Sequence, residues 1–172
     1  MDRIGAIQPE YVWLTSGTGR WTNEKSAAAL AKRAAGIDVF KIIDVSEVIK
    51  HPVTLVGREE FIKLSRGSKF AYKYGEIVQA QEGEALNGEI SVINTDIWGG
   101  IFFNIYSGDK KVTPFSEKEV ILEFEFNNKG VSPKPFTITE RVVRDDYKTN
   151  YCLIVAAMII GKPYEHSKGR TD

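Results

Sequence analysis

Apolar residues along this chain cluster in short runs that are typical of strands. Residues 11–15 and 38–49 are rich in Val, Ile and aromatic residues and contain no internal Gly or Pro, which predicts two strands. The alanine-rich segment 23–35 between them predicts a helix, with Thr22 or Asn23 as its N-cap. A strand, a helix and a strand in this order predict a right-handed crossover within one sheet, and hence an α/β arrangement.

The middle of the chain predicts several further strands. Residues 69–74 alternate aromatic side chains with smaller or charged ones, which is the period of a half-exposed strand. The segments 89–94 and 100–106 predict two more strands. The remaining predictions here are a short strand over 53–56, a helical turn or two over 58–65, a strand opening at Ile77, and a polar loop over 81–88.

The C-terminal half contains one ambiguous segment and one long apolar segment. Residues 116–126 begin with a capping box, which suits a helix, but their apolar positions alternate, which suits a strand. Both assignments stay open, and a hairpin over 119–139 is our interpretation from the residues alone. Apolar side chains recur at helical spacing over 141–160, which predicts a buried last helix.

The domain organisation predicted from these segments is simple. We expect a lead-in over 1–10, a single domain over 11–163 and a polar tail over 164–172. The sequence from Ser16 to Gly19 predicts a turn, because its two glycines permit positive φ. A lone Gly-x-Gly is too weak a signal for a nucleotide site.

Composition narrows the classes of function. The chain has 172 residues, of which 42% are hydrophobic, and its 23 basic and 23 acidic residues give a net charge of zero. Balanced charge gives no case for nucleic acid, and no apolar run is long enough to span a membrane. No signal peptide is visible, so we expect a cytoplasmic protein. The single cysteine, Cys152, falls in the apolar segment and is expected in the core.

Few residues offer recognisable chemistry. The two histidines, His51 and His166, lie too far apart in sequence to form a metal motif, and no nucleophile elbow is present. We therefore expect no metal. The most informative side chain is Ser46, which ends an apolar run beside Asp44 and Glu47. Two interpretations stay open: a strand-end hydroxyl that bonds the backbone, or a reactive serine held in a strained turn.

Three segments carry a resemblance to a known family. Residues 11–19, 32–37 and 45–49 resemble the N-terminal third of the pyruvoyl-dependent arginine decarboxylases, and residues 88–107 are also similar. The resemblance covers roughly residues 11–160. It implies an α+β fold, a four-layer αββα sandwich with mixed sheets. It also implies a homotrimer with sites for a small amine or amino acid between subunits.

The family chemistry depends on a pair of serines. Family members cut their own backbone between them, and the second serine becomes a pyruvoyl group that serves as the electron sink for decarboxylation. Arginine is thereby converted to agmatine for polyamine synthesis. In this chain Ser46 matches the first serine, whereas Glu47 stands in place of the second. A pyruvoyl cofactor is therefore expected only if the chain cuts itself at Ser46.

Other positions that the resemblance makes catalytic or substrate-binding also differ. The family's proton-donating glutamate falls at Phe103 or Asn104, its acidic substrate contact at Ala29, and an asparagine near the site at Lys41. Alternatively, Lys41 and Glu47 pair as ions if one regular strand places them on the same face.

We expect from these departures an uncleaved, inactive or altered relative that serves as a scaffold, sensor or assembly subunit. The alternative is an active pyruvoyl-dependent amino-acid decarboxylase.

Overall fold

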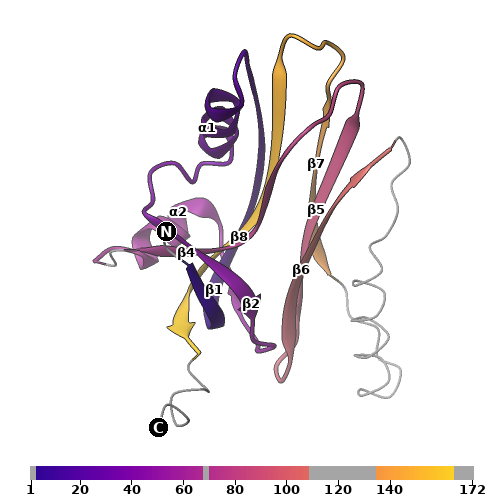
Figure 1. The fold of residues 1–172 in the computed structure, drawn as a ribbon. Coiled ribbons are helices and arrows are strands. Elements are labelled where there is room, and N and C mark those ends of the chain that lie inside the picture. The colour runs from indigo at the N-terminus through magenta and orange to yellow at the C-terminus, as the bar shows by residue number, and fades with distance from the viewer. Residues whose placement is uncertain (1–2, 68–69, 109–134, 165–172) are drawn as a thin grey trace, which may run out of the picture.

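Two sheets and two helices make up the part of the chain that the computed structural model describes, residues 3–67, 70–108 and 135–164 (Figure 1). The elements in chain order are β1 (Arg3–Trp21), α1 (Glu24–Ala34), β2 (Ile42–Val48), β3 (Thr54–Leu55), α2 (Arg58–Leu64), β4 (Ala71–Gln79), β5 (Ala85–Asn94), β6 (Gly99–Ser107), β7 (Phe136–Val143) and β8 (Asn150–Pro163). This is a mixed α+β domain, as the sequence predicts.

The larger sheet has five strands in the order β2-β4-β8-β1-β3, and β2 also pairs with β1. β1 runs parallel to β2 and antiparallel to β8, so the sheet is mixed. The predicted strand-helix-strand unit is confirmed, because β1, α1 and β2 follow one another and the two strands pair in parallel. The smaller sheet, β6-β5-β7, is antiparallel throughout.

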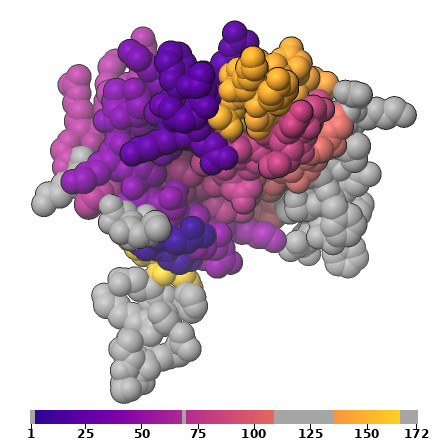
Figure 2. Space-filling view, turned by 45° about the horizontal axis from the view of Figure 1, so that its top comes forward, coloured from indigo at the N-terminus to yellow at the C-terminus, as the bar shows by residue number. Residues whose placement is uncertain are grey.

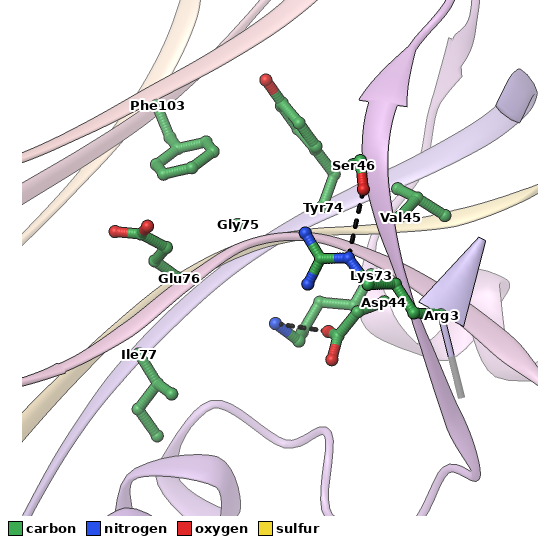
Figure 3. Close-up of a pocket in the computed structure, with 10 residues that line it drawn as sticks. All are labelled: Arg3, Asp44, Val45, Ser46, Lys73, Tyr74, Gly75, Glu76, Ile77 and Phe103. Atoms are coloured by element: carbon green, nitrogen blue, oxygen red, sulfur yellow. Dashed lines mark hydrogen bonds and ion pairs between the residues drawn. The ribbon is translucent and has the colours of Figure 1, made fainter. Parts of the chain in front are cut away.

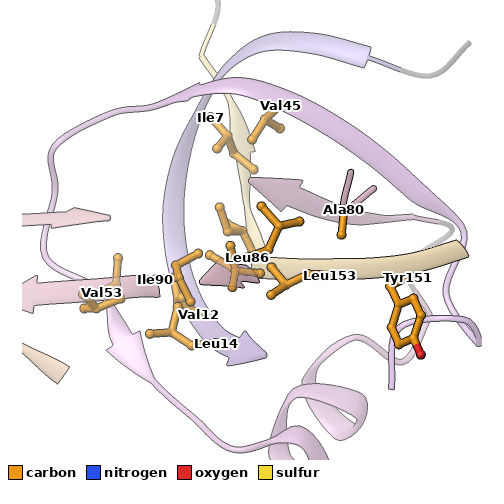
Figure 4. Packing of buried hydrophobic residues seen from close by; sticks show 14 residues of the cluster. Ile7, Val12, Leu14, Val45, Val53, Ala80, Leu86, Ile90, Tyr151 and Leu153 are labelled. Carbon is orange, nitrogen blue, oxygen red and sulfur yellow. The ribbon is translucent and has the colours of Figure 1, made fainter. Parts of the chain in front are cut away.

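The predicted last helix is wrong, because residues 150–163 form the central strand β8. Its side chains alternate between two apolar clusters. Leu153, Val155 and Ile159 pack between the two sheets, in the cluster drawn in Figure 4. Ile154 and Met158 pack under the helices. A strand that is buried on both faces is apolar at every position, so its period of two is hidden.

The two clusters define three layers: helices, the larger sheet and the smaller sheet. In the space-filling view the orange surface, which belongs to β7 and the start of β8, lies directly beside the indigo N-terminal elements, and β1 contacts β7 (Figure 2). The described residues thus contain both sheets and one helical layer of the expected αββα sandwich. Residues 116–126, whose assignment as helix or strand stayed open, lie outside the described residues, as does most of the hairpin expected over 119–139.

The predicted turn at residues 16–19 is wrong, because β1 continues through it. The two glycines serve close packing instead. A Cβ at Gly17 would press on the backbone of Ala31 and Ala35, and a Cβ at Gly19 would overlap the backbone of Ala27 and Ala31. Helix α1 therefore lies directly on the strand. The helix itself is confirmed, with Asn23 Oδ1 accepting from the Ser26 amide at 2.8 Å.

Three boundaries also differ from the prediction. Residues 3–10, expected as a lead-in, are part of β1, because they pair with β2 and β8. The strand expected over 38–49 is shorter and covers Ile42–Val48. The loop expected over 81–88 ends early, because β5 begins at Ala85. Residues 3–10 and 85–88 were not predicted as strands because their composition is polar or mixed. Pairing with neighbouring strands decides their structure.

Replacing Gly19 by alanine tests the close contact between β1 and α1. We expect Gly19→Ala to lower the free energy of unfolding by about 3 kcal/mol, because the new methyl group must push the helix off the sheet. Gly5→Ala is the matched control on the same strand, since a Cβ there has no heavy atom within 4 Å. Urea unfolding of both variants measures the difference; equal stabilities would contradict the contact.

The thiol of Cys152 tests the burial of β8. Its side chain is fully buried, as predicted, and burial raises the pKa of the thiol to about 11. We expect almost no reaction with a thiol reagent at pH 8 in the native protein, because both access and the thiolate are suppressed. The denatured chain provides the control and should react completely within minutes. Rapid labelling of the native protein would show that β8 is not held in the core.

Candidate functional site

A cavity of about 390 Å³ lies where β2 separates from β4 (Figure 3). The two strands pair only from Ile42–Ala71 to Asp44–Lys73. Beyond this point β2 turns to pair with the first residues of β1, while β4 continues alongside β8. Within the described part of the chain, the edge of β4 after Lys73 has no neighbouring strand on this side, so the fork stays open. We call this cavity the fork pocket.

Charged side chains of three strands meet in the fork pocket. Arg3 of β1 donates from Nε to Oγ of Ser46 at 3.1 Å. Lys73 of β4 lies 2.8 Å from Oδ1 of Asp44, and Lys73 is 8% exposed. A buried ammonium needs such a partner, because an unpaired charge away from water is costly. Asp44 therefore fixes the position of the Lys73 amine at the pocket wall.

Aromatic side chains form another wall of the pocket. Phe103 reaches across from β6 of the smaller sheet and meets Tyr74 edge to face, with ring centroids 5.2 Å apart. Val45 belongs to the same inter-sheet side, whereas Ile77 lines the pocket from the helix side of β4. The pocket thus combines ionic groups from the larger sheet with an apolar wall that both sheets share.

Tyr74 is held in its neutral form over a wide pH range. Burial raises the pKa of the Tyr74 phenol, and the negative charge of Glu47 raises it further. Both effects disfavour the phenolate, one by removing water and the other by like-charge repulsion. At neutral pH the hydroxyl is therefore a hydrogen-bond donor at the rim of the pocket.

The structure brings together some of the residues that the sequence singles out. Ser46 and Phe103 line the fork pocket, and Glu47 is close enough to act on Tyr74. Asn104, which follows Phe103 along β6, faces the opposite side of the sheet and pairs across from Glu89.

Lys41 and Ala29 lie elsewhere. Lys41 precedes β2, with its ammonium 6.0 Å from the ring centroid of Phe70, so it is not on one regular strand with Glu47. Ala29 lies on the exposed face of α1, beside Trp21.

Sequence reasoning did not single out Arg3 and Lys73. Arg3 lies in the segment that was expected to be a lead-in. Lys73 was expected on the solvent-exposed side of an alternating strand. The period of two was correct, but the far side of β4 here faces the pocket rather than open water. Only the path of β2, which is a property of the fold, could have shown this.

Comparison with known proteins does not assign the chain to a family. No protein-family profile and no curated protein sequence matches the chain. Within the described ranges, no group of three or more His, Cys, Asp or Glu side chains is arranged to hold a metal ion. No helix in the same ranges is long and apolar enough to cross a membrane.

Removing the charge of Glu47 tests the electrostatics of the site. We expect Glu47→Gln to lower the Tyr74 pKa while burial keeps it above the normal value of about 10. A titration of the tyrosine ring carbons by NMR between pH 8 and 12 measures the shift. Because the folded-state pKa is raised, the neutral phenol stabilises the fold below about pH 10, and this contribution is lost as the pH rises through the raised pKa.

Glu82→Gln is the matched control, because Glu82 is exposed and lies outside the pocket. An unchanged Tyr74 titration in Glu47→Gln, or an equal change in both variants, would show that Glu47 does not act on Tyr74.

Proposed function

We propose that this protein is an uncleaved, non-catalytic relative of the pyruvoyl-dependent arginine decarboxylases that binds a small molecule in the fork pocket. The observation that carries the proposal is the position of Ser46 within a regular paired strand, followed by a carboxylate. Sensing or scaffolding by ligand binding is the function that remains when the self-cleavage step is lost. The homotrimer implied by the resemblance is part of the proposal.

The backbone around Ser46 supports the absence of self-cleavage. To cut the chain, a serine Oγ must attack the carbonyl of the preceding residue, which needs a strained backbone and donors aimed at the oxyanion. Ser46 lies inside β2, where residues on both sides of it pair in parallel with β1. Its Oγ accepts a hydrogen bond from Arg3 of the neighbouring strand, so the hydroxyl is directed towards β1.

The residue after Ser46 supports the same conclusion. A pyruvoyl group forms by elimination from a serine ester, and the Glu47 side chain has no hydroxyl that could form one. Cutting before Ser46 would instead make Ser46 the reactive residue. Because successive strand residues face opposite sides, the carbonyl group would then point away from the side used in the family.

The size and lining of the fork pocket support a small ligand. A cavity of about 390 Å³ is within the usual range for small-molecule sites, and its lining joins apolar surface with a few polar groups. The proton donor that decarboxylation needs has no counterpart at Phe103. Binding without chemistry is therefore the function that the pocket supports best.

The intact mass of the purified protein tests this proposal. We expect a single chain of 19.3 kDa, unchanged after prolonged incubation, and no release of carbon dioxide from arginine. Two fragments that meet near residues 45–47, with a carbonyl group at the start of the larger one, would overturn the proposal in favour of an active decarboxylase. Ser46→Ala is the control, since it abolishes any cleavage that depends on this hydroxyl. Light scattering of the same sample measures the number of subunits.

A further inference from the structure

We infer that the ligand of the fork pocket is a small monocarboxylate with an apolar or aromatic body. This inference rests on the proposed function, in which the pocket binds a small molecule, and it adds the chemical class of that molecule. It follows from the separation of the pocket into a cationic side and an aromatic side.

The cationic side can hold one carboxylate group. Arg3 uses Nε on Ser46, and its guanidinium carries further N–H donors in a planar fork that matches a carboxylate. Ser46 Oγ is the acceptor in that bond, so its own O–H proton can be donated to the ligand. The Lys73 ammonium, fixed by Asp44, lines the same cavity and carries three N–H donors. Donors from β1, β2 and β4 therefore converge.

The acidic residues around the pocket limit the charge of the ligand. Asp44 and Glu76 also line the cavity, and Glu47 acts on Tyr74 beside it. One negative charge is compensated by Arg3, but a second would face these carboxylates. A planar monoanion therefore fits better than a doubly charged, tetrahedral phosphate.

The aromatic side requires an apolar body on the ligand. Phe103 and the Tyr74 ring form an edge-to-face aromatic surface beside the charged groups, and they come one from each sheet. A small carboxylate such as acetate would leave this surface in water. An aromatic ring attached through a short linker would cover it and gain affinity from the apolar area that it buries.

A pair of probes that differ only in charge tests the inference on the full-length protein. We expect 3-phenylpropionate to bind at least about tenfold more tightly than 3-phenylpropylamine, acetate and inorganic phosphate, since a charge-assisted hydrogen bond is worth about a factor of ten or more. Amide NMR titration measures the affinities and should show shifts at Arg3, Ser46 and Tyr74. Tighter binding of the amine or of phosphate, or no binding of the acid, would overturn the inference.

Arginine variants locate the binding site. Arg3→Gln should weaken binding of 3-phenylpropionate about tenfold or more, and Arg3→Lys should give an intermediate loss because it keeps the charge without the fork. Arg33→Gln, on the exposed side of α1, is the matched control and should bind normally. Equal affinities in Arg3→Gln and Arg33→Gln would place the acid elsewhere and overturn the inference.

The amide spectra show whether each variant is folded before it is titrated. The intact mass of the same samples separates the two proposals. A single uncleaved chain that binds the amine preferentially overturns the ligand class alone, whereas a cleaved chain overturns the proposed function.

Discussion

The burial of β8 on both faces is the constraint on which the rest of the structure depends. Its residues from Tyr151 to Ile159 supply one side of the cluster between the sheets and one side of the cluster under the helices. Each fully buried Leu, Ile, Val or Met contributes about 2 kcal/mol from the removal of apolar area from water. A strand in this position must have a strand on each side, and β1 and β4 occupy these places. Both neighbours then carry residues of the fork pocket.

The fork pocket follows from the different lengths over which β2 pairs with its two neighbours. β2 begins beside β4 and ends beside β1, so it spans from one neighbour of β8 to the other. Its pairing with β4 ends at Asp44–Lys73, whereas its pairing with β1 continues to Val48, so the edge of β4 beyond Lys73 is left open within the described residues. The cavity is therefore a consequence of strand topology, and the side chains of Arg3, Ser46 and Lys73 are placed in it by register.

The sequence predicted those elements whose environment differs between their two sides. The helix at α1 was evident from its alanines and its Asn23 cap, and the alternation over 69–74 was evident because one side of β4 is aromatic. β8 was mistaken for a helix because both of its sides are buried, and an unbroken apolar run matches either period. Gly17 and Gly19 were mistaken for a turn. Their role is to let the backbone of α1 pack directly on β1, and this contact between separate elements is not visible in the local sequence.

The same distinction applies to the candidate site. Ser46 was singled out because it ends an apolar run beside two carboxylates and matches a serine of the family that the chain resembles, whereas Lys73 looked like an ordinary surface lysine. Asn104 and Phe103 were equally good positions in the sequence, and only the register of β6 against β5 decides that Phe103 faces the larger sheet. Residues that act through pairing across strands carry no local signal, so the pocket could be described only once the strands were in place.

The fork also links the regular geometry of Ser46 to the existence of the pocket. The pairing of Asp44–Val48 with β1 keeps the backbone at Ser46 extended, and β2 is no longer paired with β4 beyond Asp44, where the cavity lies. A strained turn at Ser46 would require β2 to leave β1, which would remove Arg3 from its contact with the serine hydroxyl. The geometry that would allow the backbone to be cut and the geometry that keeps Arg3 on the serine hydroxyl are therefore mutually exclusive at this position.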